Sequence, residues 1–453
     1  MKRLSIIILA VLLIGTAGCS GKTSSESSKT QPQSQISDKK ESMSESSKPL
    51  TDESSENSKP LTDESSENSK PHEEETDTEN IITEVVDKNS RHIGEIRKSG
   101  SVTLTDYGIF YTTVKTLSVQ DAPITTGTAD NVTTTTYHLY DPVKNEHYDF
   151  GSVSGQDYEA GYVRTEIDGR LYTLITTGNA LDNIPDDLLL VEFDLVKHSI
   201  QQYKLSDNGF PYTAMTEING NLLILNHDQQ EKLCDKLLLF NTKTKDCQQV
   251  LEFELNNNQG DTIRGIYSDG EQIYLLRLHF EDENNIRMFL DSYDIQFQKL
   301  SEKDISPMIQ KSVEKSLTPA DIPNEMKQML SRFMVLNRQY VYYENFSATC
   351  FLGNTETGEL FKEFDGMGGL FLAASGSGKP FFYYIFGGGD NVKENAVFEW
   401  KDGTLEKSVF AADDERYYIV SATVSPNGKK LIQTEYVNPN DRNDSLPARL
   451  YYF

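Results

Sequence analysis

The amino-acid sequence predicts an all-β protein built as a seven-bladed β-propeller, and three observations carry this prediction. Short runs rich in Val, Ile, Tyr, Phe and Leu alternate with Asn, Asp and Gly turns along most of the 453 residues, as strands and hairpins do. Two kinds of turn recur at a spacing of about 52 residues, which suits one four-stranded blade. The last copy of the pattern ends one strand short, at Phe453.

The chain begins with a segment that predicts export. Lys2 and Arg3 precede an apolar run over residues 4–14, which is shorter than the roughly 18 to 20 residues that cross a bilayer as a helix. Thr16, Ala17, Gly18 and Cys19 follow, and this stretch resembles a bacterial lipobox. The resemblance implies that residues 1–18 are a signal peptide and that the sulfur of Cys19 carries diacylglycerol.

Lipidation of Cys19 would make the lipid bilayer a partner of the mature chain, because two or three acyl chains together anchor a protein stably. The expected location is the outer face of the bacterial cytoplasmic membrane, or the outer membrane if the envelope is Gram-negative. The alternative is an uncleaved anchor in which Cys19 has no role.

Residues 19–80 are expected to form a disordered tether. The segment has almost no aliphatic or aromatic side chains, so it cannot bury enough surface to offset the entropy of ordering. SKPLTDESSEN occurs at residues 47–57 and again at 58–68. One Leu and one Pro in each copy argue against a helical repeat.

The first kind of turn follows an apolar run that ends in Asp or Asn, whose side chain accepts hydrogen bonds from backbone N–H groups two residues on and closes a hairpin. In five copies the Asp or Asn that ends the apolar run is Asp141, Asp194, Asn241, Asp294 or Asn354. In a sixth copy, VFEWKDGT, the acidic residue of the turn lies one position later, at Asp402.

The second kind is a glycine turn before a strongly apolar strand, as in IDGRLYTLI. Asn337 replaces the glycine in one copy. The six glycines are Gly108, Gly169, Gly220, Gly270, Gly378 and Gly428.

The count of turns predicts how the ring closes. Seven copies of one kind and six of the other leave the last blade without its outer strand, and an open edge would expose unpaired backbone groups. We therefore expect a segment within residues 81–98 to complete residues 81–453 as a propeller of seven blades, with six or eight as the alternatives. A helical insertion is expected near residues 307–330.

The turn SPNGKKL at residues 425–431 resembles the SPDGKKL turn of WD40-like and TolB-like propellers. Together with the lipobox, the chain resembles a bacterial membrane-anchored propeller lipoprotein. Such families mostly imply binding or scaffolding, by analogy of fold.

Composition limits the partners. The formal net charge is −27, and most of the acid excess belongs to residues 81–453. So negative a protein is not expected to bind nucleic acid. Cys234, Cys247 and Cys350 are too few for a disulfide scaffold; a bond between Cys234 and Cys247 and three buried thiols are the two interpretations.

No catalytic signature stands out. The seven histidines show no HExxH spacing, and SGSGK at residues 375–379 fits neither a nucleophile elbow nor a phosphate loop. No catalytic residue, metal ligand or cofactor is assigned, although calcium would suit a gathering of acidic loops.

The loops between second and third strands emerge on one rim of a propeller, and here they are rich in Asp and Asn. They could bind a partner together, because exposed loops on a rigid scaffold often carry function; the alternative is that Asx residues serve the turns alone. The candidate rim residues are Asp182, Asp186, Asp187, Asp282, Asp390, Asn391, Asn440, Asp441 and Asp444.

The sequence thus favours a lipid-anchored extracytoplasmic propeller that binds or scaffolds a protein or glycan. The alternative is a propeller enzyme, a glycan or peptide hydrolase or lyase, that uses carboxylates of the channel.

Overall fold

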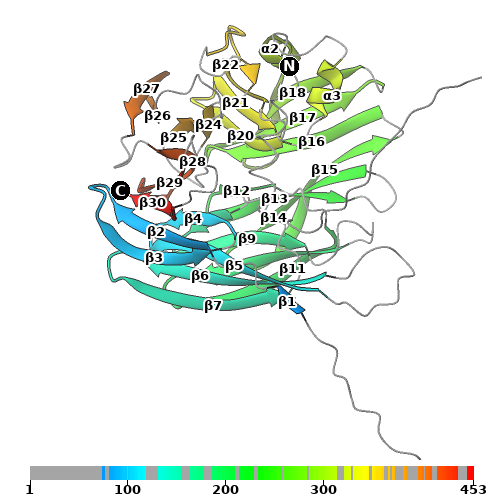
Figure 1. Ribbon diagram of the computed structural model, residues 1–453. Helices are drawn as coiled ribbons and strands as arrows, with labels where there is room; N and C mark the ends of the chain where they lie inside the picture. Colours follow the sequence, from blue (N-terminus) through cyan, green and yellow to red (C-terminus); the bar gives the residue numbers. More distant parts are fainter. Residues whose placement is uncertain are drawn as a thin grey trace, which may run out of the picture. The chain divides into compact units, whose positions relative to one another are not determined.

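The computed structural model gives the arrangement of most of the chain from Glu74 onward (Figure 1). The residues it describes are 74–76, 81–98, 100–118, 131–154, 164–176, 186–209, 214–228, 233–256, 259–282, 285–313, 321–327, 330–345, 349–361, 366–367, 370–372, 381–384, 396–401, 403–410, 416–436 and 446–453. Cys19 and most of the expected tether, residues 19–73 and 77–80, lie outside them, as do Gly378 and Asp402. Residues 74–76 belong to the segment expected to be disordered, but they form a short strand that pairs with residues 116–118.

The described strands form six hydrogen-bonded sheets. The first sheet contains β1 (Glu74–Thr76), β4 (Val102–Thr105), β5 (Gly108–Ser118), β6 (Asn131–Asp141) and β7 (Glu146–Ser154). The second sheet contains β8 (Arg164–Ile167), β9 (Arg170–Thr176), β10 (Asp186–Asp194) and β11 (Ser199–Gly209).

The third sheet has eight strands in chain order. They are β12 (Ala214–Ile218), β13 (Asn221–Asp228), β14 (Leu233–Phe240), β15 (Cys247–Asn256), β16 (Gln259–Ser268), β17 (Gln272–Phe280), β18 (Ile286–Asp294) and β19 (Lys299–Asp304). Its two halves are joined by a short pairing of β15 with β16, Leu255 with Gly260 and Asn256 with Gln259.

The remaining three sheets contain the rest of the described strands. The fourth contains β20 (Leu330–Leu336), β21 (Tyr340–Asn345), β22 (Thr349–Asn354) and β23 (Gly366–Met367). The fifth contains β24 (Leu370–Leu372), β25 (Phe381–Tyr384), β26 (Ala396–Lys401) and β27 (Thr404–Val409). The sixth contains β28 (Tyr417–Val424), β29 (Lys430–Tyr436), β30 (Ala448–Tyr452), β2 (Ile81–Asp87) and β3 (His92–Lys98).

The predicted turns close the hairpins as expected. Asp141 Oδ1 accepts the N–H groups of Val143 (2.9 Å) and Lys144 (3.1 Å). Asp194, Asn241, Asp294 and Asn354 each accept two backbone N–H groups in the same way. Asn337, which lacks the glycine of the other copies, adopts a φ of 47°, and Asn tolerates this left-handed region better than most residues.

Hydrophobic clusters join each sheet to the next. Phe110 of the first sheet packs with Phe193 of the second, and Leu190 of the second packs with Ile224 of the third. The same kind of cluster joins the two halves of the third sheet, where Leu225 packs among Ile263 and its neighbours.

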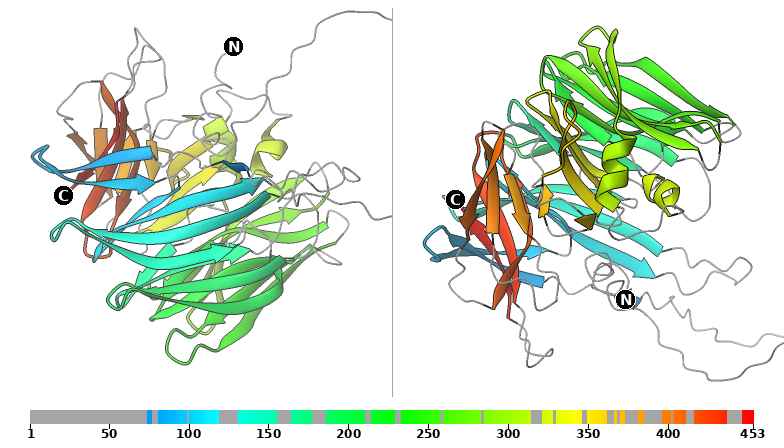
Figure 2. Two further views of the ribbon diagram at one scale, coloured as in Figure 1. Left: turned by 60° about the horizontal axis from the view of Figure 1, so that its bottom comes forward. Right: turned by 90° about the horizontal axis from the view of Figure 1, so that it is seen from above.

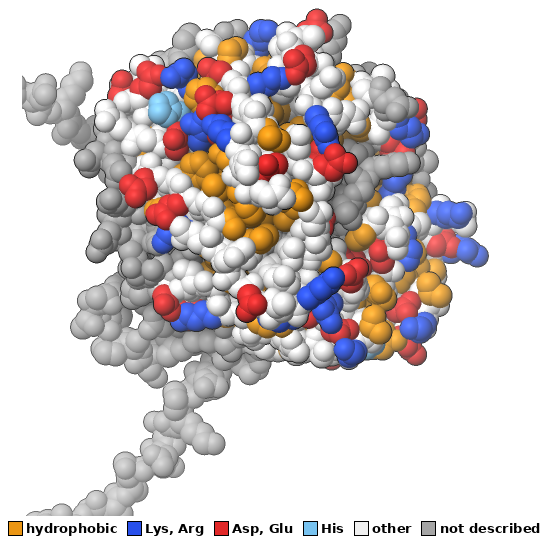
Figure 3. Space-filling view, turned by 180° about the vertical axis from the view of Figure 1, so that it is seen from behind, with side chains coloured by type: hydrophobic (Ala, Val, Ile, Leu, Met, Phe, Trp, Pro, Cys, Tyr) orange, Lys and Arg blue, Asp and Glu red, His pale blue; other side chains and the backbone are white. Residues whose placement is uncertain are grey.

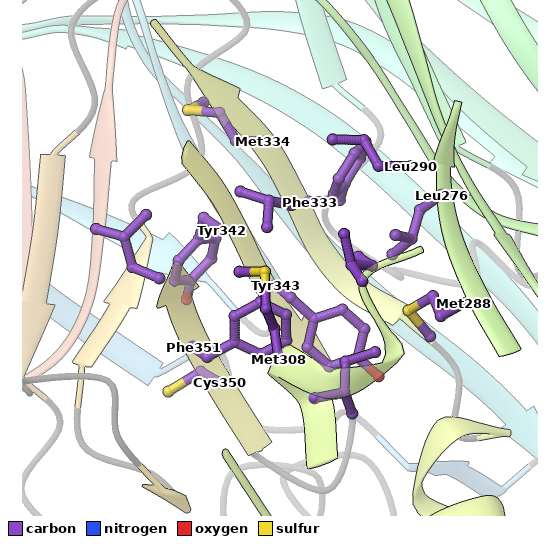
Figure 4. Close-up of a cluster of buried hydrophobic side chains, with 14 of the residues drawn as sticks. Leu276, Met288, Leu290, Met308, Phe333, Met334, Tyr342, Tyr343, Cys350 and Phe351 are labelled. Carbon is purple, nitrogen blue, oxygen red and sulfur yellow. The ribbon is translucent and has the colours of Figure 1, made fainter. Parts of the chain in front are cut away.

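The largest cluster lies between the third and fourth sheets and reaches the fifth (Figure 4). Leu276, Met288 and Leu290 come from the third sheet and Phe333, Tyr342 and Phe351 from the fourth. Met308 belongs to helix α2 (Ser306–Val313), which with α3 (Ile322–Met326) occupies the segment where a helical insertion was expected.

The last sheet meets the first, which makes the arrangement cyclic (Figure 2). Tyr383 of the fifth sheet packs with Ile419 of the sixth, and Leu450 of the sixth packs with Leu104 and Ile109 of the first. Four-stranded sheets that follow one another and return to the first are the arrangement of a β-propeller. The protein is therefore an all-β propeller.

The predicted segment completes the sixth sheet, but it adds two strands where one was expected. β2 pairs with β30 in parallel, Thr83 with Ala448 through Asp87 with Tyr452. β3 then turns back and pairs with β2 in antiparallel fashion, across a turn in which Asp87 Oδ1 accepts the N–H of Asn89 (2.8 Å). The N-terminal segment therefore adds a hairpin of two strands.

The cysteines of the described residues form no disulfide bond. In the β14–β15 hairpin Cys234 faces Glu254 and Cys247 faces Phe240, so a bond between the two is ruled out. Cys234 and Cys350 are buried as expected, but Cys247 is exposed because it begins the outer strand β15. No described helix is long and apolar enough to cross a membrane.

Candidate functional site

Most of the candidate rim side chains lie outside the described part of the chain. Asp186 is the first residue of β10, and its side chain lies outside the description. The residues outside the described ranges altogether are Asp182, Asp390, Asn391, Asn440, Asp441 and Asp444.

The two rim residues whose side chains are described serve their own hairpins. Asp187 Oδ1 forms an ion pair with Lys204 Nζ at 2.9 Å, within the second sheet. Asp282 is exposed, and its Oδ1 accepts the N–H of Asn285 at 2.9 Å in the turn before β18. No described contact joins these two carboxylates, and the described residues contain no group of three or more His, Cys, Asp or Glu side chains that could hold a metal ion.

A groove of about 380 Å³ lies at the opposite end of β17 from Asp282. It is formed where the β16–β17 turn of the third sheet, the β20–β21 turn of the fourth and β26 of the fifth approach one another. The lining residues are Tyr267, Asp269, Val335, Leu336, Asn337, Arg338 and Trp400.

Asp269 fixes the first of these turns. Its Oδ1 accepts the N–H groups of Glu271 (2.9 Å) and Gln272 (2.7 Å), and its Oδ2 accepts the hydroxyl of Tyr274 (3.2 Å). Gly270 supplies the left-handed φ of 88° that the turn requires. The carboxylate is therefore held in one place.

Arg338 joins the second turn to the first. Its Nε donates to Asp269 Oδ2 at 3.1 Å, and its Nη2 donates to Glu271. Arg338 itself has a φ of 57° beside Asn337 at 47°, so a tight turn of two left-handed residues directs this side chain across the groove. About half of its side-chain surface is exposed (48%).

Trp400 forms the third side of the groove. It is 6% exposed and contacts the rings of Tyr340 and Phe361 edge to face, with centroids 4.9 and 5.4 Å away. Its indole Nε1–H is buried and has no hydrogen-bond partner within the described part of the chain. A buried N–H without a partner is unfavourable.

Burial and nearby charges shift the pKa values of two side chains that line the groove, Tyr267 and Asp269. Burial, assisted by the nearby charge of Asp269, raises the pKa of Tyr267 to about 12, so its hydroxyl is neutral at physiological pH. Burial opposes ionisation of Asp269, but the N–H groups of Gln272 and Glu271 and the Arg338 guanidinium outweigh it and lower the pKa of this carboxyl.

A second polar cluster lies where the sixth, first and second sheets meet. Glu166 Oε2 of β8 accepts the N–H of Asp106 at 3.0 Å, and Lys429 Nζ donates to the carbonyl oxygen of Asp106 at 3.0 Å. Burial raises the pKa of Glu166 to about 7, and the charge of Asp106 adds to the rise. A perturbed carboxyl of this kind marks either a functional site or a structural junction.

A third link joins the halves of the third sheet. His227 Nδ1 contacts Asp235 Oδ1 at 2.5 Å, and Asp235 Oδ2 accepts the Thr262 hydroxyl (2.6 Å) and the Ile263 N–H (2.5 Å). All of these groups are buried, so the pair ties β13 and β14 to β16.

The net charge does not appear as a uniformly acidic surface. Figure 3 shows one face on which hydrophobic side chains gather in the middle and Lys and Arg side chains lie among Asp and Glu around them. Some of these opposite charges form ion pairs, such as Arg338 with Asp269.

The groove was not predicted from the sequence. Gly270, Asn337 and Trp400 belong to recognised repeats, yet nothing in the linear pattern brings two separate turns and a strand together. The available signal was that Trp400 is the one tryptophan of the chain and stands where the copy of the Asx turn is irregular.

No protein-family model matches the chain, and no curated protein does. Solved structures with a similar arrangement include the β-propeller domain of the Trilobed protease from Pyrococcus furiosus, at 12% identity and a TM-score of 0.35 over 64% of this chain and 79% of that one. A putative 6-phosphogluconolactonase from Bacteroides fragilis is 10% identical, with a TM-score of 0.35 over 70% of this chain and 93% of that one. A polysaccharide lyase, an ulvan lyase, is 8% identical, with a TM-score of 0.40 over 83% of this chain and 94% of that one. At these values no functional residue is transferred to this chain.

Proposed function

We propose that the protein is a lipid-anchored, extracytoplasmic binding module that holds a propeller of seven blades away from the membrane and binds a protein or glycan partner. The observation that carries the binding role is the groove lined by Trp400, Arg338 and Asp269. Its volume lies within the range of roughly 300 to 1,000 Å³ that small-ligand sites occupy.

The count of seven is supported by the two halves of the third sheet. They pack face to face through Leu225, Ile263 and their neighbours, as separate sheets do elsewhere in the ring. If each half is one blade, the six hydrogen-bonded sheets are seven blades, in agreement with the number of turn copies.

Lipid anchoring is supported by the residues around Cys19 alone. The envelope location and a partner outside the cytoplasm follow from that anchor. A calcium ion held by the acidic loops and a scaffold role in a larger assembly belong to the same proposal and need their own tests.

The binding role is tested by placing a photoreactive amino acid at Asn337, in the groove, and in a separate variant at Val143, which is 84% exposed on the β6–β7 turn. Irradiation of intact cells should join a protein or glycan to the Asn337 variant and not to the Val143 variant. Equal capture at both positions, or none at Asn337, would contradict a binding role for the groove.

A propeller enzyme is the second candidate, and the raised pKa of Glu166 is the observation that favours it. A carboxyl with a pKa of about 7 could give or take a proton near neutral pH. Hydrolysis or elimination of a glycan that is lost in Glu166→Gln and retained in Arg338→Gln would support the enzyme instead of the binding module.

A further inference from the structure

The geometry points to a nucleophilic hydroxyl on Thr113, activated by His138 and Asp149, that accepts an acyl group from a carboxylic ester. The three residues lie on neighbouring strands of the first sheet, β5, β6 and β7, and none of them lines the groove. This site goes beyond the proposed binding role and depends on neither the groove nor Glu166.

The first step concerns the hydrogen bonds between the three side chains. His138 Nδ1 lies 2.5 Å from Asp149 Oδ1, and His138 Nε2 lies 2.9 Å from the hydroxyl oxygen of Thr113. A carboxylate can only accept, so the proton of the neutral imidazole is on Nδ1 and Nε2 is left as an acceptor. The Thr113 hydroxyl therefore donates to Nε2, the nitrogen that can take its proton.

The second step concerns how the imidazole is held. The ring of His138 stacks on the ring of Tyr111, with centroids 4.9 Å apart and an angle of 19° between the planes. Only 14% of the His138 side chain is exposed, whereas 73% of the Asp149 side chain is. Because side chains alternate along a strand, Tyr111 and Thr113 point to the same face of β5. The base is therefore fixed beside the hydroxyl in the orientation that proton transfer requires.

The third step compares this cluster with the other short contact between a histidine and an aspartate. His227 Nδ1 also lies 2.5 Å from a carboxylate oxygen of Asp235, but there the second carboxylate oxygen accepts the Thr262 hydroxyl. That hydroxyl donates to the acid and not to the imidazole, and all three residues are buried. Thr113, in contrast, is half-buried and follows the order carboxylate, imidazole, hydroxyl, in which a hydroxyl becomes a nucleophile.

The reaction that this order supports is acyl transfer to water through the threonine. Thr113 Oγ forms a bond to the acyl carbon of the ester while its proton passes to His138 Nε2. The C–O bond to the leaving group breaks, and the leaving alcohol takes that proton. Water then attacks the acyl-threonine, gives its proton through His138 to Thr113 Oγ, and releases the carboxylic acid. One ester and one water are consumed, so no further reactant is required.

Access and charge limit the ester. The exposed side chain of Asp149 places the cluster at the surface, where a small ester can reach the half-buried Thr113. The chain carries a formal net charge of −27, which repels anionic molecules. The expected substrate is therefore a small, neutral ester.

The experiment treats the full chain with a fluorophosphonate probe and locates the adduct by peptide mass spectrometry. In this reaction the hydroxyl oxygen bonds to phosphorus, and fluoride leaves with the proton as hydrogen fluoride. We expect the adduct on Thr113. Release of p-nitrophenol from p-nitrophenyl acetate, measured in parallel, reports turnover of a neutral ester.

Two threonine variants form a matched pair. Thr113→Val keeps the β-branched shape and removes the hydroxyl, so labelling and ester hydrolysis should fall by about tenfold or more. Thr136 lies opposite Thr113 on β6, but its hydroxyl contacts Ser152. Thr136→Val should therefore react as the parent does.

Asp149→Asn tests the carboxylate as a positioning residue. The amide can donate to His138 Nδ1, which leaves the proton on Nε2 and removes the acceptor for the Thr113 hydroxyl. Labelling and hydrolysis should fall about as far as in Thr113→Val. The melting temperature should stay that of the parent, because the Asp149 side chain is 73% exposed.

The adduct in the parent chain decides the inference even if a variant folds poorly. No adduct on Thr113 would overturn it. Labelling and hydrolysis that are equal in the parent and in Thr113→Val would overturn it as well. Full reactivity in Asp149→Asn would show that the contact between His138 and Asp149 does not activate the hydroxyl.

Discussion

At the scale of single residues, side-chain oxygens replace backbone groups at the places where strands reverse. Asp194 Oδ1 accepts the N–H groups of Val196 (3.2 Å) and Lys197 (2.9 Å), and the same geometry returns at Asn241 and Asn354. Asp and Asn are therefore interchangeable at these positions, because the acceptor oxygen is the group that the turn uses.

Asp194→Ala should lower the free energy of unfolding by about 1 kcal/mol, because two N–H groups lose their intramolecular acceptor. Asp194→Asn is the matched control and should retain most of the stability. Urea unfolding of the three proteins measures the difference, and an Asn variant as unstable as the Ala variant would show that the charge, paired with Lys197, matters more than the turn.

Glu166 predicts a dependence of stability on pH. Its pKa is about 7 in the folded protein and 4.5 for an unperturbed side chain, so between these values the folded state binds more protons than the unfolded state. Stability from this group must therefore fall as the pH rises from about 4.5 to above 7.

Glu166→Gln should raise the melting temperature at pH 8 and leave it nearly unchanged at pH 4, because the amide can still accept the Asp106 N–H and carries no charge. Glu95→Gln, at an exposed position of β3, controls for the loss of one negative charge. Equal effects of the two substitutions at pH 8 would show that Glu166 is not held in its neutral form by the fold.

At the scale of elements, β2 is the strand on which the closure depends. Its inward side chains Thr83 and Val85 are fully buried, whereas Ile81 at its start is 49% exposed. The strand is therefore part of the core and not a loose extension.

Val85→Ala should destabilise the protein by about 2 to 3 kcal/mol, since a fully buried side chain loses its contacts with the first and sixth sheets. Ile81→Ala should cost less than about 0.5 kcal/mol. If thermal unfolding of the two variants is alike, β2 does not belong to the core.

The sequence predicted local elements better than it predicted their assembly. The Asx turns and glycine turns depend on two to four neighbouring residues, so Asp141, Gly169 and Asn337 could be identified from their neighbours. The parallel pairing of β2 with β30 depends on residues more than 350 positions apart, and nothing in either segment states a direction.

The candidate site shows the same division. The groove depends on two turns and strand β26, which only the packing of three sheets brings together. Its aromatic and aliphatic residues look like ordinary strand residues in the sequence. The rim prediction followed the abundance of Asp and Asn in loops, and at Asp187 and Asp282 those side chains serve their own hairpins.

At the scale of the whole molecule, the segment around β2 closes the ring, and the proposed lipid anchor at Cys19 lies outside the described residues. Cys19→Ala should leave the exported chain unprocessed or release it from the membrane fraction, because the acyl acceptor is lost. Labelling with a radioactive fatty acid measures this, and Cys247→Ala controls for loss of an unrelated thiol; unchanged labelling of the Cys19 variant would contradict the anchor.

The ring closure is tested most directly by a disulfide between β2 and β30. In a Cys247→Ser background, Thr83→Cys with Ala448→Cys joins residues that face each other in the parallel register, within the Cα separation of roughly 4.4 to 6.8 Å that a disulfide spans. Thr83→Cys with Tyr452→Cys places the second thiol four residues further on, about 13 Å away. We predict that mild oxidation joins the first pair completely and the second pair hardly at all; a bond in the second pair, or none in either, would contradict the closure.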